Sequence, residues 1–214
     1  GVLVADIYER DRQLNKYERS VRRKILTHLT VSPKPDVNMA LVITAIVIDI
    51  ERIGDYTKNI IELAQGLPEP FDGGELNDEI LALEQLVDGM FEDLVPTLKQ
   101  TDEALARTIL RRHKSLSGRV EQGLQLLRND KVLAGQSGRA VTAALYLRYL
   151  KRVSAHLKNV ATSVVNPYYR IGYKEKKKKK KKMGDPDTLL ASSLEEVTAP
   201  TNGEVDLEDP DLEE

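Results

Sequence analysis

The fold is decided by the stretch Asp49-Ile50-Glu51-Arg52-Ile53-Gly54-Asp55-Tyr56-Thr57-Lys58-Asn59, which closes a very apolar segment of the chain. Within it, Glu51 and Asp55 are four residues apart. On a helix this spacing puts both carboxylates on one face, one turn apart. Two like charges in that position repel each other, so the pattern predicts a compensating cation, either a metal ion or a basic side chain.

The apolar segment before this stretch can be interpreted in two ways. Val42 to Ile48 is rich in β-branched residues and could be a buried strand. The apolar spacing nevertheless continues through Ile53 and Ile60 at helical intervals, over about 28 residues in all, whereas a strand rarely exceeds about ten. Length therefore favours a single helix that ends near Gln65, and we expect its opening turns to be buried on all sides.

Four more helices are expected from the same periodicity, at residues 2–30, 76–99, 102–129 and 136–166. The segment Ser32-Pro33-Lys34-Pro35 ends the first of them, because proline cannot continue the helical hydrogen-bond ladder. Asp36 or Asn38 is then available to cap the second helix. Since only 5% of the residues are aromatic and there is no tryptophan, the composition favours an aliphatic, all-α, antiparallel helix bundle.

The composition also excludes several kinds of site and separates a body from a tail. There is no cysteine, which rules out disulfides, thiolate zinc sites and cysteine catalysis. From Met183 onward the chain has eleven acidic residues and no Lys or Arg, while residues 174–182 hold eight lysines and one glutamate. Residues 1–173 are therefore nearly neutral, and the charge blocks belong to an appendage. The longest apolar run, residues 39–48, is about half of what a membrane-spanning helix needs.

An internal repeat organises the body of the chain. A shift of 100 residues places Arg52 on Arg152 and Lys58 on Lys158, and a weaker match at a shift of 102 relates the two preceding helices. The second copy has one more helix in front of it, at 76–99. We therefore expect two tandem three-helix repeats, the first without its opening helix, at residues 1–66 and 67–173, followed by a disordered Lys-rich and then acidic tail at 174–214. The chain begins at Gly1 inside a helical pattern, so we also expect residues upstream of it.

The segment from Glu51 to Glu62, with its Glu-Arg-Ile-Gly-Asp-Tyr-Thr-Lys-Asn core, resembles the signature of the PhoU family. The preceding helix with Asp11 and Glu18, the Pro-containing loop and the tandem repeat are also similar to that family, over about residues 5–170. The resemblance implies a cytoplasmic, non-enzymatic regulator that restrains a phosphate ABC transporter and its phosphate-sensing kinase. The implied partners are the transporter ATPase and the sensor histidine kinase, together with a homodimer and peripheral contact with the inner membrane.

PhoU proteins carry Glu/Asp-x-x-x-Asp motifs that hold iron or zinc, and the resemblance therefore implies a divalent metal at this motif. Glu51 and Asp55 match it, and Asp11 and Asn15 on the neighbouring helix would add oxygen ligands, which suit hard or borderline metals. The alternative is a surface face on which these carboxylates pair with Arg52, Arg22 or Arg23. Both interpretations stay open at this point.

The second repeat departs from the metal motif. Lys151 and Ala155 stand where the first repeat has Glu51 and Asp55, and His113 and Ser117 replace the other two oxygen-bearing residues. An ammonium group cannot be a ligand and repels a cation, so we expect a metal in the first repeat only. Gly54 lies inside the signature helix at a cost of roughly 1 kcal/mol relative to Ala. We interpret it as a close approach between helices, and Ser154, also small, is its counterpart.

The lysine run is expected to contact a membrane or another polyanion, because each lysine near an anionic membrane contributes about 1 kcal/mol. No pattern for specific nucleic-acid recognition accompanies it, and a solvated linker balanced by the acidic tail is the alternative. The run comprises Lys176, Lys177, Lys178, Lys179, Lys180, Lys181 and Lys182.

Two further functions compete with the free regulator. Similar domains are appended to sodium–phosphate cotransporters, so the chain is alternatively the cytosolic PhoU domain of such a protein. A metal-dependent hydrolase is a weaker candidate, because the three histidines His28, His113 and His156 are scattered and supply no ligand set.

Overall fold

The computed structural model describes residues 2–175, and every regular element in that range is helical. Five α-helices follow one another: α1 (Val2–Val31), α2 (Val37–Gln65), α3 (Asn77–Gln100), α4 (Glu103–Arg128) and α5 (Ser137–Val165). Two short 3-10 helices, η1 (Gly74–Leu76) and η2 (Tyr168–Arg170), precede α3 and follow α5. The all-α prediction is confirmed, and each expected helix lies within a residue or two of its expected position. None of these helices is both long and apolar enough to cross a membrane.

The helix ends follow from local chemistry. The Asp36 carboxylate accepts a hydrogen bond from the backbone N–H of Met39 at 2.8 Å, so Asp36 is the N-cap of α2. Thr101 adopts the left-handed conformation at φ 53° and ends α3, and Asp102 then caps α4 by accepting from the N–H groups of Ala104 and Leu105. These caps allow a two-residue connection between α3 and α4.

The core lies where α3, α4 and α5 meet. Leu83 and Met90 from α3, Ile109 from α4, and Leu147 and Leu157 from α5 are almost completely removed from water. Each buried side chain of this kind contributes about 1.5–3 kcal/mol to folding. This three-helix core is the rigid body against which the rest of the described chain is positioned.

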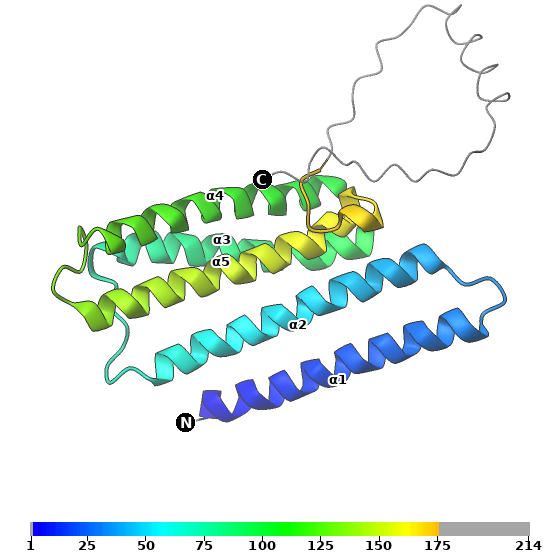
Figure 1. Ribbon diagram of the computed structural model, residues 1–214, viewed down its shortest axis with the longest axis horizontal. Helices are drawn as coiled ribbons and strands as arrows, with labels where there is room; N and C mark the ends of the chain where they lie inside the picture. Colours follow the sequence, from blue (N-terminus) through cyan, green and yellow to red (C-terminus); the bar gives the residue numbers. More distant parts are fainter. Residues whose placement is uncertain (1, 176–214) are drawn as a thin grey trace, which may run out of the picture. The chain divides into compact units, whose positions relative to one another are not determined.

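The hairpin of α1 and α2 is attached to this core through α2 alone. Helix α2 lies beside α5, and α1 packs on α2, on the side away from the core (Figure 1). Ile53 of α2 joins the core, while Ile46, Ile50 and Ile60 pack against it half-buried. Helix α1 is therefore an edge helix with a long free face.

The expectation that the opening turns of α2 are buried on all sides is wrong. Met39, Leu41 and Ile48 are 52%, 38% and 41% exposed, whereas Ala40 and Val47 are buried. The segment is a helix rather than a strand, but α2 packs against α1, α5 and η2 in a way that leaves Met39, Leu41 and Ile48 exposed. Composition indicated an apolar helix, and only the packing shows which of its faces are covered.

Candidate functional site

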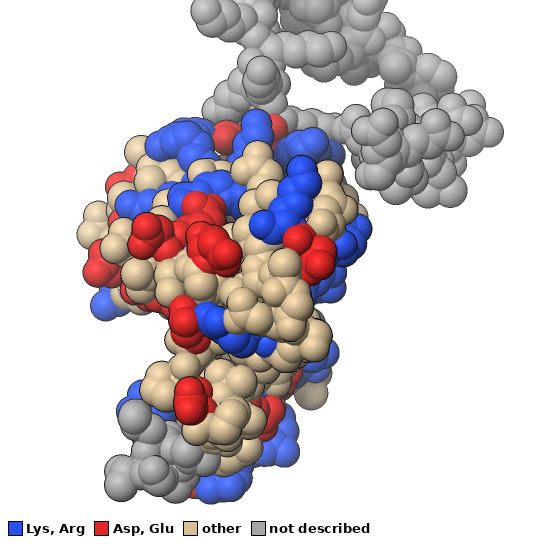
Figure 2. Space-filling model, turned by 90° about the vertical axis from the view of Figure 1, so that its left-hand side faces the viewer, with Lys and Arg blue, Asp and Glu red and all other residues tan. Residues whose placement is uncertain are grey.

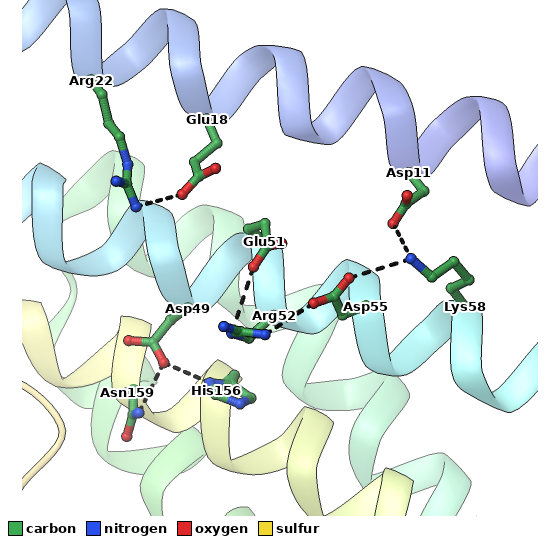
Figure 3. Close-up of polar contacts among 10 residues, drawn as sticks. All are labelled: Asp11, Glu18, Arg22, Asp49, Glu51, Arg52, Asp55, Lys58, His156 and Asn159. Carbon is green, nitrogen blue, oxygen red and sulfur yellow. Dashed lines mark hydrogen bonds and ion pairs between the residues drawn. The ribbon is translucent and has the colours of Figure 1, made fainter.

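The acidic cluster, which we define as Asp11, Glu51 and Asp55, forms where α1 crosses α2 (Figure 3). The close approach of the two helices depends on Gly54. A Cβ atom at that position would lie 2.2 Å from Cδ2 of Leu14, so no other residue fits without a shift of Leu14. This is the helix packing expected for Gly54, and it brings Asp11 of α1 over the carboxylates of α2.

Two basic side chains from α2 form ion pairs with the acidic cluster. The Lys58 ammonium donates a hydrogen bond to Asp11 at 2.9 Å and lies 3.5 Å from Asp55. The Arg52 guanidinium donates to Asp55 at 3.2 Å and lies 3.7 Å from Glu51. The compensating cations that the spacing predicts are therefore present as side chains, and Lys58 bridges the two helices.

The electrostatics of the acidic cluster follow from its partial burial. The side chains of Asp11, Glu51 and Asp55 are only 17%, 18% and 27% exposed. Burial raises the pKa of Glu51, and the neighbouring Asp55 raises it further, while Arg52 opposes both. The pKa of Lys58 is raised by its hydrogen bond to Asp11, against the effect of burial. Glu51 is therefore harder to ionise than a free glutamate, whereas the charged form of Lys58 is stabilised. The three carboxylates outnumber the two basic side chains, so the ion-pair network has excess negative charge.

The predicted metal ligands lie on the two sides of the α1–α2 crossing, where Lys58 links Asp11 to Asp55 and Arg52 links Asp55 to Glu51. Asp11, Glu51 and Asp55 come together, and the Asn15 amide donates to the backbone carbonyl of Asp11 at 3.0 Å. Their oxygen atoms are of a suitable kind. Lys58 and Arg52, however, already occupy the positions between them, and within residues 2–175 no three acidic or His side chains gather in a metal-binding group. A metal at this cluster stays a prediction.

Of the arginines considered as alternative partners, only Arg52 contacts the acidic cluster. Arg22 donates instead to Glu18 within α1, at 2.6 Å. The lysine run at 176–182 lies outside the described residues, as does the acidic tail.

In the second repeat, the positions that correspond to the acidic cluster hold basic and neutral side chains. The Ser154 hydroxyl donates to the Lys151 carbonyl at 2.8 Å and lies 3.0 Å from Nδ1 of His113. Because the hydroxyl hydrogen is already used, His113 Nδ1 is the donor to Ser154. Burial, with help from Lys158 and Lys151, lowers the pKa of His113 to about 4. Lys158 donates to the Gly172 carbonyl in place of a carboxylate.

A polar contact that the sequence did not predict joins α2 to α5. The Asp49 carboxylate accepts from Nδ1 of His156 at 2.7 Å and from the Asn159 amide at 2.9 Å. The His156 ring also stacks on Tyr56, with centroids 5.6 Å apart. The repeat gives no direct signal for this contact, because a shift of 100 pairs Asp49 with Tyr149 rather than with His156.

These features define a class of protein: a helical bundle with an acidic cluster at the α1–α2 crossing. Residues 2–64 match the family model of the PhoU domain. A phosphate-specific transport system accessory protein PhoU homolog from Synechocystis is 23% identical over 160 residues, which cover 74% of this chain and 71% of that protein. A homolog with the same description from Pseudomonas putida is 25% identical over 166 residues, covering 76% of this chain and 65% of the relative.

The fold agrees with a solved member of the same family. The crystal structure of PhoU from Pseudomonas aeruginosa has a TM-score of 0.66 and 22% identity, covering 76% of this chain and 79% of that chain. Together with the sequence matches, this confirms the resemblance found from the signature. Residues 2–64 match the PhoU domain, and the chain is similar to PhoU homologs over about three quarters of its length.

Proposed function

We propose that the protein regulates phosphate uptake as a PhoU-type accessory protein. The observation that carries this proposal is the similarity to phosphate transport accessory proteins over three quarters of the chain, at matching fold. The regulated partners are a phosphate ABC transporter, through its ATPase, and the sensor histidine kinase that reports phosphate supply. We accordingly propose that the protein acts in the cytoplasm, at the inner face of the membrane where the transporter lies.

We propose that the protein acts by binding rather than by catalysis. The carboxylates of the acidic cluster are held by Arg52 and Lys58, an arrangement that fixes helix geometry and leaves no carboxylate free to act as a base. The Lys58 bridge ties α1 to α2. A partner or a cation that changes this bridge would change the position of α1 relative to the core.

We further propose that iron, zinc or another divalent metal competes with Lys58 for the oxygens of Asp11 and Asp55. The Lys58 ammonium and a divalent cation would bind the same two carboxylates, so only one of them can occupy the space between Asp11 and Asp55 at a time. Metal occupancy would then require the Lys58 side chain to move out.

Complementation tests the regulatory function. A bacterial strain without its own PhoU protein, carrying a reporter of a phosphate-starvation gene, is supplied with the full chain and grown with abundant phosphate. We expect the reporter to be repressed and the transporter ATPase to be recovered with the protein after cross-linking. An unrepressed reporter at normal protein levels contradicts the proposal.

The acidic cluster is tested in the same strain with paired variants. Glu51→Gln with Asp55→Asn is expected to weaken repression. The matched control is Asp88→Asn with Glu92→Gln, which alters an exposed pair at the same four-residue spacing on α3 and should leave repression unchanged. Equal behaviour of the two double variants would show that the acidic cluster has no regulatory role.

A further inference from the structure

Four basic residues of α1 form a row on one face of the helix. Arg12, Lys16, Arg19 and Arg23, which we call the α1 stripe, are separated by four, three and four residues, so they fall on one side of a helix with 3.6 residues per turn. All four side chains are exposed. The opposite side of α1 faces α2 through Leu14 and through Asp11.

The charge of the α1 stripe is mostly uncompensated within the protein. Arg12 pairs with Glu9 at 2.6 Å, in an exposed contact that contributes little. Lys16, Arg19 and Arg23 form no ion pair in the part of the chain that the structure describes. In Figure 2, Lys and Arg side chains lie around the bottom of the view, with some Asp and Glu side chains beside them. The row is therefore available to an external anion.

The internal repeat shows that the α1 stripe is not a requirement of the fold. A shift of 102 residues places its members on Lys114, Gly118, Glu121 and Gln125 of α4. The equivalent helix thus folds with one basic residue, one acidic residue and two uncharged residues at these positions. The four basic residues of α1 call for an explanation other than packing.

We propose that the α1 stripe is a docking face for an anionic phospholipid membrane. Its four charges extend over about 16 Å along a straight helix, which is too long for a single small anion and suits a plane of separate headgroups. Arg12, Lys16 and Arg19 also line a shallow hollow of about 370 Å³, together with Asn15 and Glu18, and the carboxylate of Glu18 is held by Arg22. Because α1 is the edge helix, a flat surface can reach all four residues at once.

The expected strength follows from the number of charges. Each basic residue near an anionic leaflet contributes about 1 kcal/mol, which is about fivefold in affinity, so removal of four charges should weaken binding by on the order of 10³-fold at low salt. The effect should shrink at high ionic strength, because the charges are exposed and screened. The proposal does not rest on the role in phosphate uptake, and either can fail without the other.

Vesicle co-sedimentation of the full chain tests the α1 stripe. The vesicles are phosphatidylcholine with about one third phosphatidylserine, and pure phosphatidylcholine vesicles are the blank. The test variant carries Arg12→Gln, Lys16→Gln, Arg19→Gln and Arg23→Gln. The control variant carries Arg111→Gln, Lys114→Gln, Arg128→Gln and Arg148→Gln, four exposed residues of α4 and α5 that form no salt bridge within residues 2–175.

Both variants are also made in a background with Lys176–Lys182 replaced by Gln, so that the lysine run cannot mask the result. We expect the stripe variant to lose binding to the anionic vesicles in the background without the lysine run, and the control variant to keep most of it. Unchanged binding of the stripe variant in the background without the lysine run overturns the proposal. So does an equal loss in both variants, or stripe-dependent binding of a DNA fragment or an acidic peptide without any binding of vesicles.

Discussion

Replacement of the buried His113 should change how the stability of the protein depends on pH. The folded protein holds this imidazole neutral with a pKa of about 4, against an ordinary value of 6.5, chiefly because it is buried. The pKa is depressed on folding, so the stability that the neutral ring provides is complete above pH 6.5. It is lost as the pH falls toward 4, because the unfolded chain binds the proton first.

The magnitude follows from these two pKa values. Between pH 7 and pH 5 the linkage relation gives a loss of about 2 kcal/mol, and partial solvent access reduces this to about 1–2 kcal/mol. His113→Gln removes the titration and, because the flexible amide does not reproduce the position of the ring nitrogen, also the hydrogen bond to the Ser154 hydroxyl. At pH 7 the variant should be less stable than the natural protein by about 1 kcal/mol, the value of one hydrogen bond. At pH 5 this gap should close or reverse.

Urea denaturation at both pH values measures the free energy of unfolding of the natural protein and of His113→Gln. The difference between the two proteins isolates the effect of His113, because the contributions of other titrating groups cancel. His28→Gln is the control, since this histidine lies exposed at the end of α1. If His113→Gln loses as much stability between pH 7 and pH 5 as the natural protein does, His113 is not the group responsible and the reasoning fails.

Three other predictions concern the helix contacts. Gly54→Ala should be neutral or destabilise by up to about 2 kcal/mol in the natural protein, but should stabilise by about 1 kcal/mol when Leu14→Ala has removed the clash, as judged by urea denaturation. Lys58→Met should cost about 1–3 kcal/mol and should make the melting temperature rise on addition of Zn²⁺ more than it does in the natural protein. Arg119→Met should lower the melting temperature at pH 7, because Arg119 donates two 2.7 Å hydrogen bonds to Glu79 and lowers the pKa of that carboxyl. The difference in melting temperature between the variant and the natural protein should vanish as the pH falls below 4.5, where Glu79 becomes protonated.

Each of these predictions has an outcome that contradicts it. The same sign for Gly54→Ala in both backgrounds would show that Leu14 is not the limiting contact. An equal response to Zn²⁺ with and without Lys58 would show that the ammonium and the metal do not compete. A deficit of Arg119→Met that persists at pH 3 would mean that the arginine stabilises by packing rather than by its charge.

The helices were predictable because their signals are local. The break between α1 and α2 follows from the prolines at 33 and 35, and the end of α2 follows from the loop after Gln65. The face shared by Glu51 and Asp55 follows from helical spacing alone. The importance of Gly54 was predictable as well, since a glycine inside a long helix is costly unless something passes close to it.

The sequence by itself determined that the chain forms amphipathic helices, that two carboxylates lie one turn apart on the second of them, and that they need a cation. All of this depends on residues within a few turns of one another. Only the tertiary structure decided which cation is present, because Lys58 reaches Asp11 across 47 positions of sequence through a helix crossing set by Gly54 and Leu14. It likewise decided that the apolar start of α2 is partly exposed and that Asp49 meets His156, since burial and distance depend on which helices pack together.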